Sequence, residues 1–264
     1  MKVDLSQDVT VERDDNITLC RINNFSERMK NCIKESLTVV CYGPNANIPD
    51  AAQKFTFDKT IKSFRERFNN KTPEMKKGML GELLAHILIN NYIDTLKVFS
   101  LYFNKEEANI RKGFDILYVD TCFNSIRYGE VKSGELHQNC TINETNRNLL
   151  FKAETDLAEK LRDNDRQVLW DNAKIDASLY CAKKCNIDLH SLLNNDEDTH
   201  LSNDKRAILI SVCFHKADDK LEIEEIKKFY NQHTNRQVFQ DTIIFSIQKD
   251  TLEKIQSFMM EECN

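Results

Sequence analysis

The sequence predicts an α/β fold in which a mixed sheet is flanked by helices and the core runs helix, three strands, helix, strand. A strongly apolar helical run covers residues 75–93, and three short segments rich in β-branched and aromatic residues follow it. A long helical stretch at 144–185 then precedes an apolar run at 206–215 that is typical of a buried strand. Such alternation is expected when helices pack on the faces of one sheet.

Residues 1–70 are polar and irregular, and we expect them to form an N-terminal extension to a main domain at 71–264. Helices are expected near 26–37 and 58–68, with a turn-like Gly-Pro pair between them.

The main domain begins with a helix whose start is marked by Thr72, Pro73 and Glu74, because Pro suits the first helical turn. The charged run at 154–166 is expected to form a solvated helix face. The other elements expected after residue 93 are strands at 98–103, 114–120 and 126–132, a break in the long helical stretch near 163–165, a polar loop at 194–204, the buried strand at 206–215, a helix at 221–232, a strand at 242–248 and a closing helix at 251–263.

Composition favours a globular cytoplasmic protein. Of the 264 residues, 41% are hydrophobic and 30% charged, which supports both a core and a polar surface. No apolar run approaches the roughly 18 residues of a membrane span, so we expect no membrane contact. The N-terminus lacks the pattern of a secretory signal, and the nine cysteines have no framework spacing, so reduced thiols are expected.

The net charge of −5 is unfavourable for a nucleic-acid binder that works alone, because such affinity rests on neutralising phosphates. Either a local basic patch contacts the nucleic-acid backbone or a partner delivers the substrate. The basic residues cluster at Arg65, Arg67, Lys71, Lys76 and Lys77, and again at Arg111 and Lys112.

Three short motifs carry the candidate chemistry: Gly81-Glu82 in the apolar helix, Gly113-Phe114-Asp115, and Gly129-Glu130-Val131-Lys132. Two carboxylates followed by a Glu-x-Lys pair are typical of metal-dependent phosphodiesterases. Acidic oxygens hold Mg²⁺ there, and a lysine steers the attacking water and offsets the charge of the phosphate.

Strand geometry predicts that the last two motifs meet. Glu130 and Lys132 share one face of a strand, about 7 Å apart. If the two strands form a hairpin about a loop centred on Cys122-Phe123, Asp115 lies opposite Glu130, with Cβ atoms about 5 Å apart. Two carboxylates at this distance repel each other, and a divalent metal ion between them is the simplest way to offset the repulsion. A register shift of one residue would separate the two faces.

Glu82 lies on a helix face among mainly apolar residues, where a carboxylate is expensive to bury without a partner. A metal would supply that partner, and His86, one turn on, could support it. Each motif also has a plainer interpretation: Glu82 paired with a lysine, Asp115 in a turn, and Glu130 with Lys132 on a solvated strand face.

On these residues the chain resembles the PD-(D/E)XK nuclease superfamily, which implies a restriction-endonuclease-like fold for residues 71–264. Within it, the Gly78-x-x-Gly81-Glu82 helix and the two strand motifs are similar to the HamA-like nuclease subunit of Hachiman antiviral systems. One departure is Phe114, which stands where the superfamily often has proline before the aspartate.

The resemblance implies a role for each matched residue. Asp115 and Glu130 would ligate Mg²⁺, or Mn²⁺ as a substitute, together with the Val131 carbonyl. Glu82 would be a further ligand, direct or through water, and Lys132 would position the attacking water. The resemblance further implies a DNA nuclease that acts as the effector of a defence complex with a superfamily 2 helicase. The alternative is a non-catalytic regulatory subunit that retains the fold.

Overall fold

The computed structural model describes residues 3–43, 46, 54–103, 113–136, 140–162, 167–181, 187–215, 219–250 and 252–261. Its centre is a seven-stranded mixed sheet with the order β1-β2-β7-β6-β5-β4-β3. The middle pairs from β2 to β5 are parallel, and the outer pairs β1–β2, β5–β4 and β4–β3 are antiparallel. The strands are β1 (Val9–Asp14), β2 (Ile17–Ile22), β3 (Leu96–Val98), β4 (Ile116–Asp120), β5 (Ser125–Glu135), β6 (Arg206–Phe214) and β7 (Asp241–Lys249).

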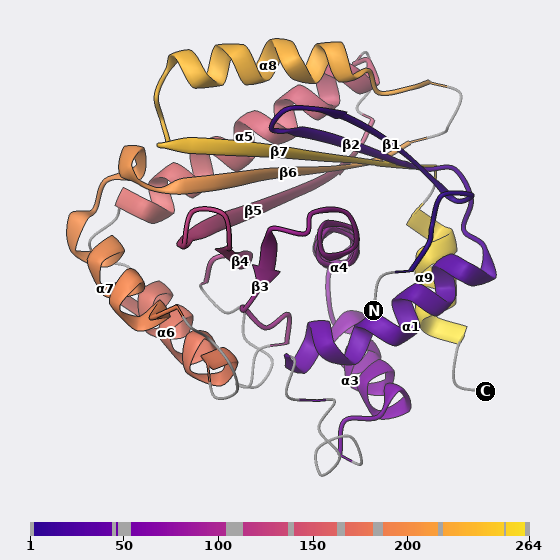
Figure 1. The fold of residues 1–264 in the computed structure, drawn as a ribbon. Coiled ribbons are helices and arrows are strands. Elements are labelled where there is room, and N and C mark those ends of the chain that lie inside the picture. The colour runs from indigo at the N-terminus through magenta and orange to yellow at the C-terminus, as the bar shows by residue number, and fades with distance from the viewer. Residues whose placement is uncertain are drawn as a thin grey trace.

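Helices cover both faces of this sheet, which confirms the predicted α/β class (Figure 1). One face carries α5 (Ile142–Arg162) and α8 (Ile223–Asn235). On the other face lie α1 (Glu27–Tyr42), α3 (Phe57–Asn69), α4 (Pro73–Tyr92) and α9 (Leu252–Glu261), while α6 (Gln167–Cys181) and α7 (Leu189–Thr199) flank the β4 end.

The position of the central strands explains why their sequences are almost continuously apolar. Apart from Arg206 at its start, every residue of β6 is buried, because helices cover it from both sides. Two apolar clusters result, one between the sheet and the α1, α3, α4 and α9 group, the other around α5, α6, α7 and α8.

The predicted β-hairpin is confirmed, with its register. Ile116 pairs with Gly129 and Asp120 with Ser125, which is the predicted register. The paired residues end at Ile116, so Asp115 and Glu130 are next in line just beyond the end of the ladder. The turn ends at Asn124, whose φ of 49° is a left-handed conformation that Asn tolerates. From Pro73 onward the helix, the three strands, the long helical stretch and the strand β6 follow in the predicted order. α5 and α6 make up that helical stretch, and an additional helix, α7, precedes β6.

The expectation that residues 1–70 are irregular is wrong for the first part of the chain. β1 and β2 form a hairpin around Asp15 (φ 47°), and β2 pairs in parallel with β7. Most of β1 is partly exposed, so its apolar content is low, as expected for an edge strand. The N-terminal region therefore extends the central sheet, and the division at residue 70 stays a prediction.

Two further element predictions need correction. The strand expected at 98–103 ends at Val98, because Tyr102 and Phe103 donate their N–H groups to the Val40 and Cys41 carbonyls of the last turn of α1. The polar loop expected at 194–204 instead contains the second half of α7 and a short 3-10 turn. α7 forms because Leu189 and Leu193, one turn apart, are both buried. No helix in the described part of the chain is long and apolar enough to cross a bilayer.

Candidate active site

The four predicted site residues come from three elements that meet at one end of the β4–β5 hairpin. Asp115 directly precedes β4, Glu130 and Lys132 lie on β5, and Glu82 lies on α4. α4 packs closely on β5 at Gly81, where an added Cβ would lie 1.8 Å from the Ser133 Oγ. This glycine brings the adjacent Glu82 toward the strand.

Asp115 and Glu130 converge on one ammonium group. The Nζ of Lys160, from α5, lies 3.2 Å from the Oδ1 of Asp115 and 2.5 Å from the Oε2 of Glu130. The other Asp115 oxygen accepts a 2.8 Å hydrogen bond from the Val131 N–H. The contact that Val131 makes here is therefore through its N–H and not through its carbonyl, the atom predicted to bind metal.

Lys132 lies on the other side of the Glu130 carboxylate. Its Nζ is 2.7 Å from the Oε1 of Glu130 and 2.7 Å from the Oδ2 of Asp156, on α5. Burial would lower the pKa of Lys132, but Glu130 and Asp156 outweigh it and raise that pKa above its ordinary value. Lys132 is therefore an ammonium group at neutral pH, held between two carboxylates.

Glu130 is fully buried. Burial first, and then the negative charge of Asp115, raise the pKa of Glu130 to about 7 against the opposing effect of Lys160 and Lys132. A buried carboxyl group whose pKa is perturbed in this way is a common property of functional sites.

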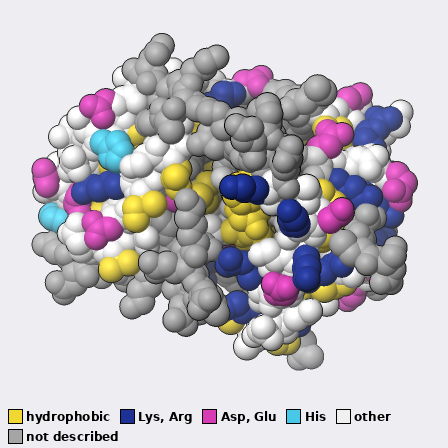
Figure 2. All heavy atoms as spheres, turned by 90° about the horizontal axis from the view of Figure 1, so that it is seen from below, with side chains coloured by type: hydrophobic (Ala, Val, Ile, Leu, Met, Phe, Trp, Pro, Cys, Tyr) yellow, Lys and Arg dark blue, Asp and Glu magenta, His cyan; other side chains and the backbone are white. Residues whose placement is uncertain are grey.

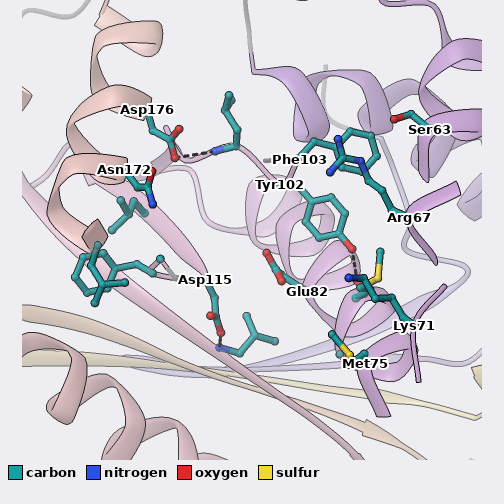
Figure 3. Close-up of a pocket in the computed structure, with 18 of the residues that line it drawn as sticks. Ser63, Arg67, Lys71, Met75, Glu82, Tyr102, Phe103, Asp115, Asn172 and Asp176 are labelled. Atoms are coloured by element: carbon teal, nitrogen blue, oxygen red, sulfur yellow. Dashed lines mark hydrogen bonds between the residues drawn. The ribbon is translucent and has the colours of Figure 1, made fainter. Parts of the chain in front are cut away.

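Glu82 stands apart from this pair. Its side chain is 28% exposed, and its carboxylate projects into the same space as that of Asp115 (Figure 3). Burial, and then the charge of Asp115, raise the pKa of Glu82 well above its usual value. Within the described ranges, however, no three carboxylate, histidine or cysteine groups lie close enough to form a metal cluster. Asp115 and Glu130 are thus brought together, with Glu82 facing them.

A cleft of about 750 Å³ opens beside these carboxylates. Figure 3 shows Glu82 and Asp115 within it, between Arg67 and Lys71 on one side and Asp176 on the other. In the view from below, Lys and Arg side chains surround an apolar hollow near the middle of this face (Figure 2). The cleft is therefore acidic at its base and partly basic at its rim.

The family model for HamA matches residues 2–263. The chain belongs to the HamA family. No curated protein matches the chain. The predicted resemblance is thus confirmed at the level of this family, which supports a role in Hachiman antiviral defence, whereas the PD-(D/E)XK superfamily assignment stays a prediction.

Sequence reasoning missed two polar residues of this HamA-family site, Asp156 and Lys160. Both lie in the run at 154–166 that was expected to be solvated, and that expectation is wrong for Lys160, whose side chain is only 17% exposed. A signal was present, because Lys160 follows Ala153 by seven residues and Leu157 by three, and both of these are buried.

The predicted basic cluster divides into separate roles in the HamA-family fold. Arg67 and Lys71 line the cleft, and the Arg67 guanidinium lies 4.6 Å from the Phe103 ring centre. Arg65 instead donates to the Met259 carbonyl. Of the others, Lys77 pairs with Glu135, Lys76 lies over the Phe68 ring, and Arg111 and Lys112 fall outside the described residues.

His86 does not support Glu82 as predicted, because its Nε2 lies 3.9 Å from the Glu82 Oε1, too far for a hydrogen bond. The ring is buried, and neither nitrogen has a hydrogen-bond partner among the described residues. Burial lowers the pKa of His86 to about 3. The imidazole is therefore neutral in the folded chain.

His86 should make the folded HamA-family chain less stable in mild acid. Its pKa is lower folded than unfolded, so the unfolded state takes up more protons and stability falls as pH drops below about 6.5. Between pH 7.5 and 5.5 the wild type should lose roughly 1 kcal/mol more unfolding free energy in urea than His86→Leu. His190→Gln, at a partly exposed histidine, is the control for the loss of a histidine elsewhere in the chain. Equal pH dependence in wild type and His86→Leu would contradict this role.

Proposed function

We propose that this HamA-family chain is a Mg²⁺-dependent deoxyribonuclease and the effector subunit of a Hachiman defence complex with a superfamily 2 helicase. The observation that carries the proposal is that Asp115 and Glu130 both contact one ammonium group, that of Lys160. The Lys132 ammonium lies beside them. The competing interpretation is a non-catalytic subunit. The fully buried Glu130 favours catalysis, because burying an ionisable group costs free energy that an apolar side chain of similar size would not.

The residues fit a magnesium ion. Mg²⁺ in phosphate-transferring sites is commonly held by one or two carboxylates and keeps several waters, so the absence of a three-ligand cluster among the described residues is compatible with it. Asp115 and Glu130 would hold the ion, and Glu82 would bind one of its waters. Mn²⁺ would fit the same oxygen ligands. A bound ion would neutralise charge on the phosphate and lower the pKa of water.

The side chains around Glu130 define the rest of the chemistry. Lys132 donates to Glu130 and Asp156, so its ammonium is fixed at the edge of the acidic centre. From there it can orient the attacking water and stabilise the negative charge that builds up on the phosphate in the transition state. Asp156 is a positioning residue, because it acts on the phosphate only through Lys132.

The rim of the cleft supplies the contacts to the nucleic-acid backbone in this proposal. Arg67, in the last turn of α3, and Lys71, just after that helix, line the cleft that contains Glu82 and Asp115. Cations at this position would bind the phosphates next to the one being hydrolysed. Because only these two of the five clustered basic residues line the cleft, and the chain carries a net charge of −5, we propose that the helicase delivers the DNA.

Replacing both rim residues, Arg67→Ala with Lys71→Ala, should weaken DNA binding about tenfold or more and flatten its salt dependence, because two phosphate contacts are lost. Fluorescence anisotropy with a labelled oligonucleotide at two salt concentrations measures both quantities. Lys62→Ala, an exposed lysine on α3 outside the cleft, should leave binding unchanged. Equal losses in the control and the double variant would show that α3 contributes only general charge.

The test of the proposed function is hydrolysis of supercoiled and linear DNA by the purified chain, with and without the helicase, in Mg²⁺ and in EDTA. We expect cleavage that needs Mg²⁺ and copurification of the chain with the helicase. Helicase binding without cleavage of either DNA would favour the regulatory alternative.

A further inference from the structure

Lys160 occupies the position between the two carboxylates that the proposed function assigns to a divalent cation. Its Nζ contacts one oxygen of Asp115 and one of Glu130, and these contacts join residues that precede β4, lie within β5 and lie near the end of α5. A single ammonium thus balances two carboxylates that would otherwise repel each other.

The surroundings make this contact strong and also reversible. The Lys160 side chain is 17% exposed, so water screens the two ion pairs only partly. Its charged end is reached through a flexible four-carbon chain, which can withdraw without movement of α5. The nearby buried residues Leu157 and Leu161 hold the helix itself against the sheet.

The second lysine of the site differs in its contacts. Lys132 contacts Glu130 through the opposite oxygen, Oε1, and is anchored by Asp156, which holds it away from Asp115. Among the ion pairs of the described residues, only that of Lys160 bridges Asp115 and Glu130. One ammonium can therefore stay in place while the other leaves.

We propose that Lys160 is a resident counter-cation, which holds Asp115 and Glu130 together in the metal-free chain and which a divalent ion must displace in order to bind. This inference rests on the proposed function, because it assumes that the two carboxylates bind a divalent ion. It makes Lys160 a residue that sets the metal concentration at which the site is filled. A high threshold would keep the nuclease inactive at low free Mg²⁺.

The direction of the expected effect follows from charge. Lys160→Met keeps an unbranched side chain of similar length and removes the competing charge. The metal-free variant should melt at a lower temperature than wild type, because Asp115 and Glu130 then repel each other without a counter-charge. Its affinity for Mn²⁺ should rise by about tenfold or more, since no cation must be expelled.

The experiment is titration of Mn²⁺ into the purified full chain by isothermal calorimetry, with the melting temperature followed in parallel. Lys152→Met, an exposed lysine on the same helix, is the matched control and should bind Mn²⁺ like wild type. Asp115→Asn with Glu130→Gln should abolish binding, in the wild-type and in the Lys160→Met background, and so locates the ion.

The outcomes separate the two claims. Tighter Mn²⁺ binding by Lys160→Met, without such a change in Lys152→Met, supports the counter-cation role. Equal or weaker binding in Lys160→Met, with wild-type binding that depends on the two carboxylates, overturns this inference and leaves the proposed function intact. Wild-type binding that is absent, or that survives loss of both carboxylates, overturns the metal site and the counter-cation role together.

Discussion

Glu130→Gln should abolish Mg²⁺-dependent DNA hydrolysis, with a loss of about a thousandfold or more in rate. The amide lacks the negative charge that a divalent ion requires, and it leaves the Lys132 and Lys160 ammonium groups without their shared carboxylate. The variant should still fold and bind the helicase, because the amide has nearly the shape of the carboxyl group.

The matched control for this change is Glu135→Gln, at the end of the same strand, where an exposed carboxylate pairs only with Lys77 among the described contacts. We expect it to cleave DNA at the wild-type rate, since exposed ion pairs contribute little. A gel-based assay with supercoiled plasmid, at several enzyme concentrations, measures the cleavage rates of the wild type, Glu130→Gln and Glu135→Gln. Cleavage by Glu130→Gln at the control rate would move the catalytic centre elsewhere.

The raised pKa of Glu130 predicts that the metal affinity of the site depends on pH. Metal binding needs the ionised carboxylate, and burial together with the charge of Asp115 raises the pKa of that group to about 7. Metal affinity should therefore fall as pH drops below about 7, because protons compete with the ion. A Mn²⁺ titration at pH 6 and at pH 8 is expected to show the weaker binding at pH 6.

Gly81→Ala should destabilise the fold by about 3 kcal/mol, because its methyl group would overlap β5. The added Cβ would lie 1.8 Å from the Ser133 Oγ and 2.8 Å from the Ser133 Cβ, so α4 would have to move away from the strand. Glu82 follows directly in the chain, and the same displacement would carry its carboxylate away from Asp115. Chemical unfolding measures the stability, and DNA cleavage reports the displacement.

Gly78→Ala, on the same helix, should have the opposite effect on stability. No atom lies within 4 Å of a Cβ at Gly78, so this substitution should stabilise the chain by roughly 0.5–1 kcal/mol through the higher helix propensity of alanine. Adding Ser133→Gly to Gly81→Ala removes both overlapping atoms and should recover part of the loss. Similar unfolding free energies for the two alanine variants would show that α4 and β5 do not need this close contact.

The position of the site within the hairpin was predictable because both of its determinants are local. Side chains alternate along a strand, and the loop midpoint fixes which residues face each other, so Asp115 opposite Glu130 follows from short-range pattern alone. The α4 helix, with Glu82 on it, was predictable for the same reason, since its apolar residues and its start signal at Thr72 and Pro73 are contiguous.

The N-terminal strands β1 and β2 could not be predicted from local sequence patterns. β2 gains its place from parallel pairing with β7, more than two hundred residues along the chain, and nothing in the short segment Ile17–Ile22 specifies that neighbour. Tyr102 and Phe103 likewise leave the strand pattern because the end of α1 offers them carbonyl groups. Both outcomes depend on which distant segments lie alongside.

By itself, the sequence determined the α/β class, the hairpin register and the acidic pair, because each depends on periodicity or on neighbours within about twenty residues. The tertiary structure alone decided that Lys160 enters the acidic centre and that α3 forms a wall of the cleft. The direction in which a helix turns its charged residues depends on what it packs against, and for α5 that surface is the sheet.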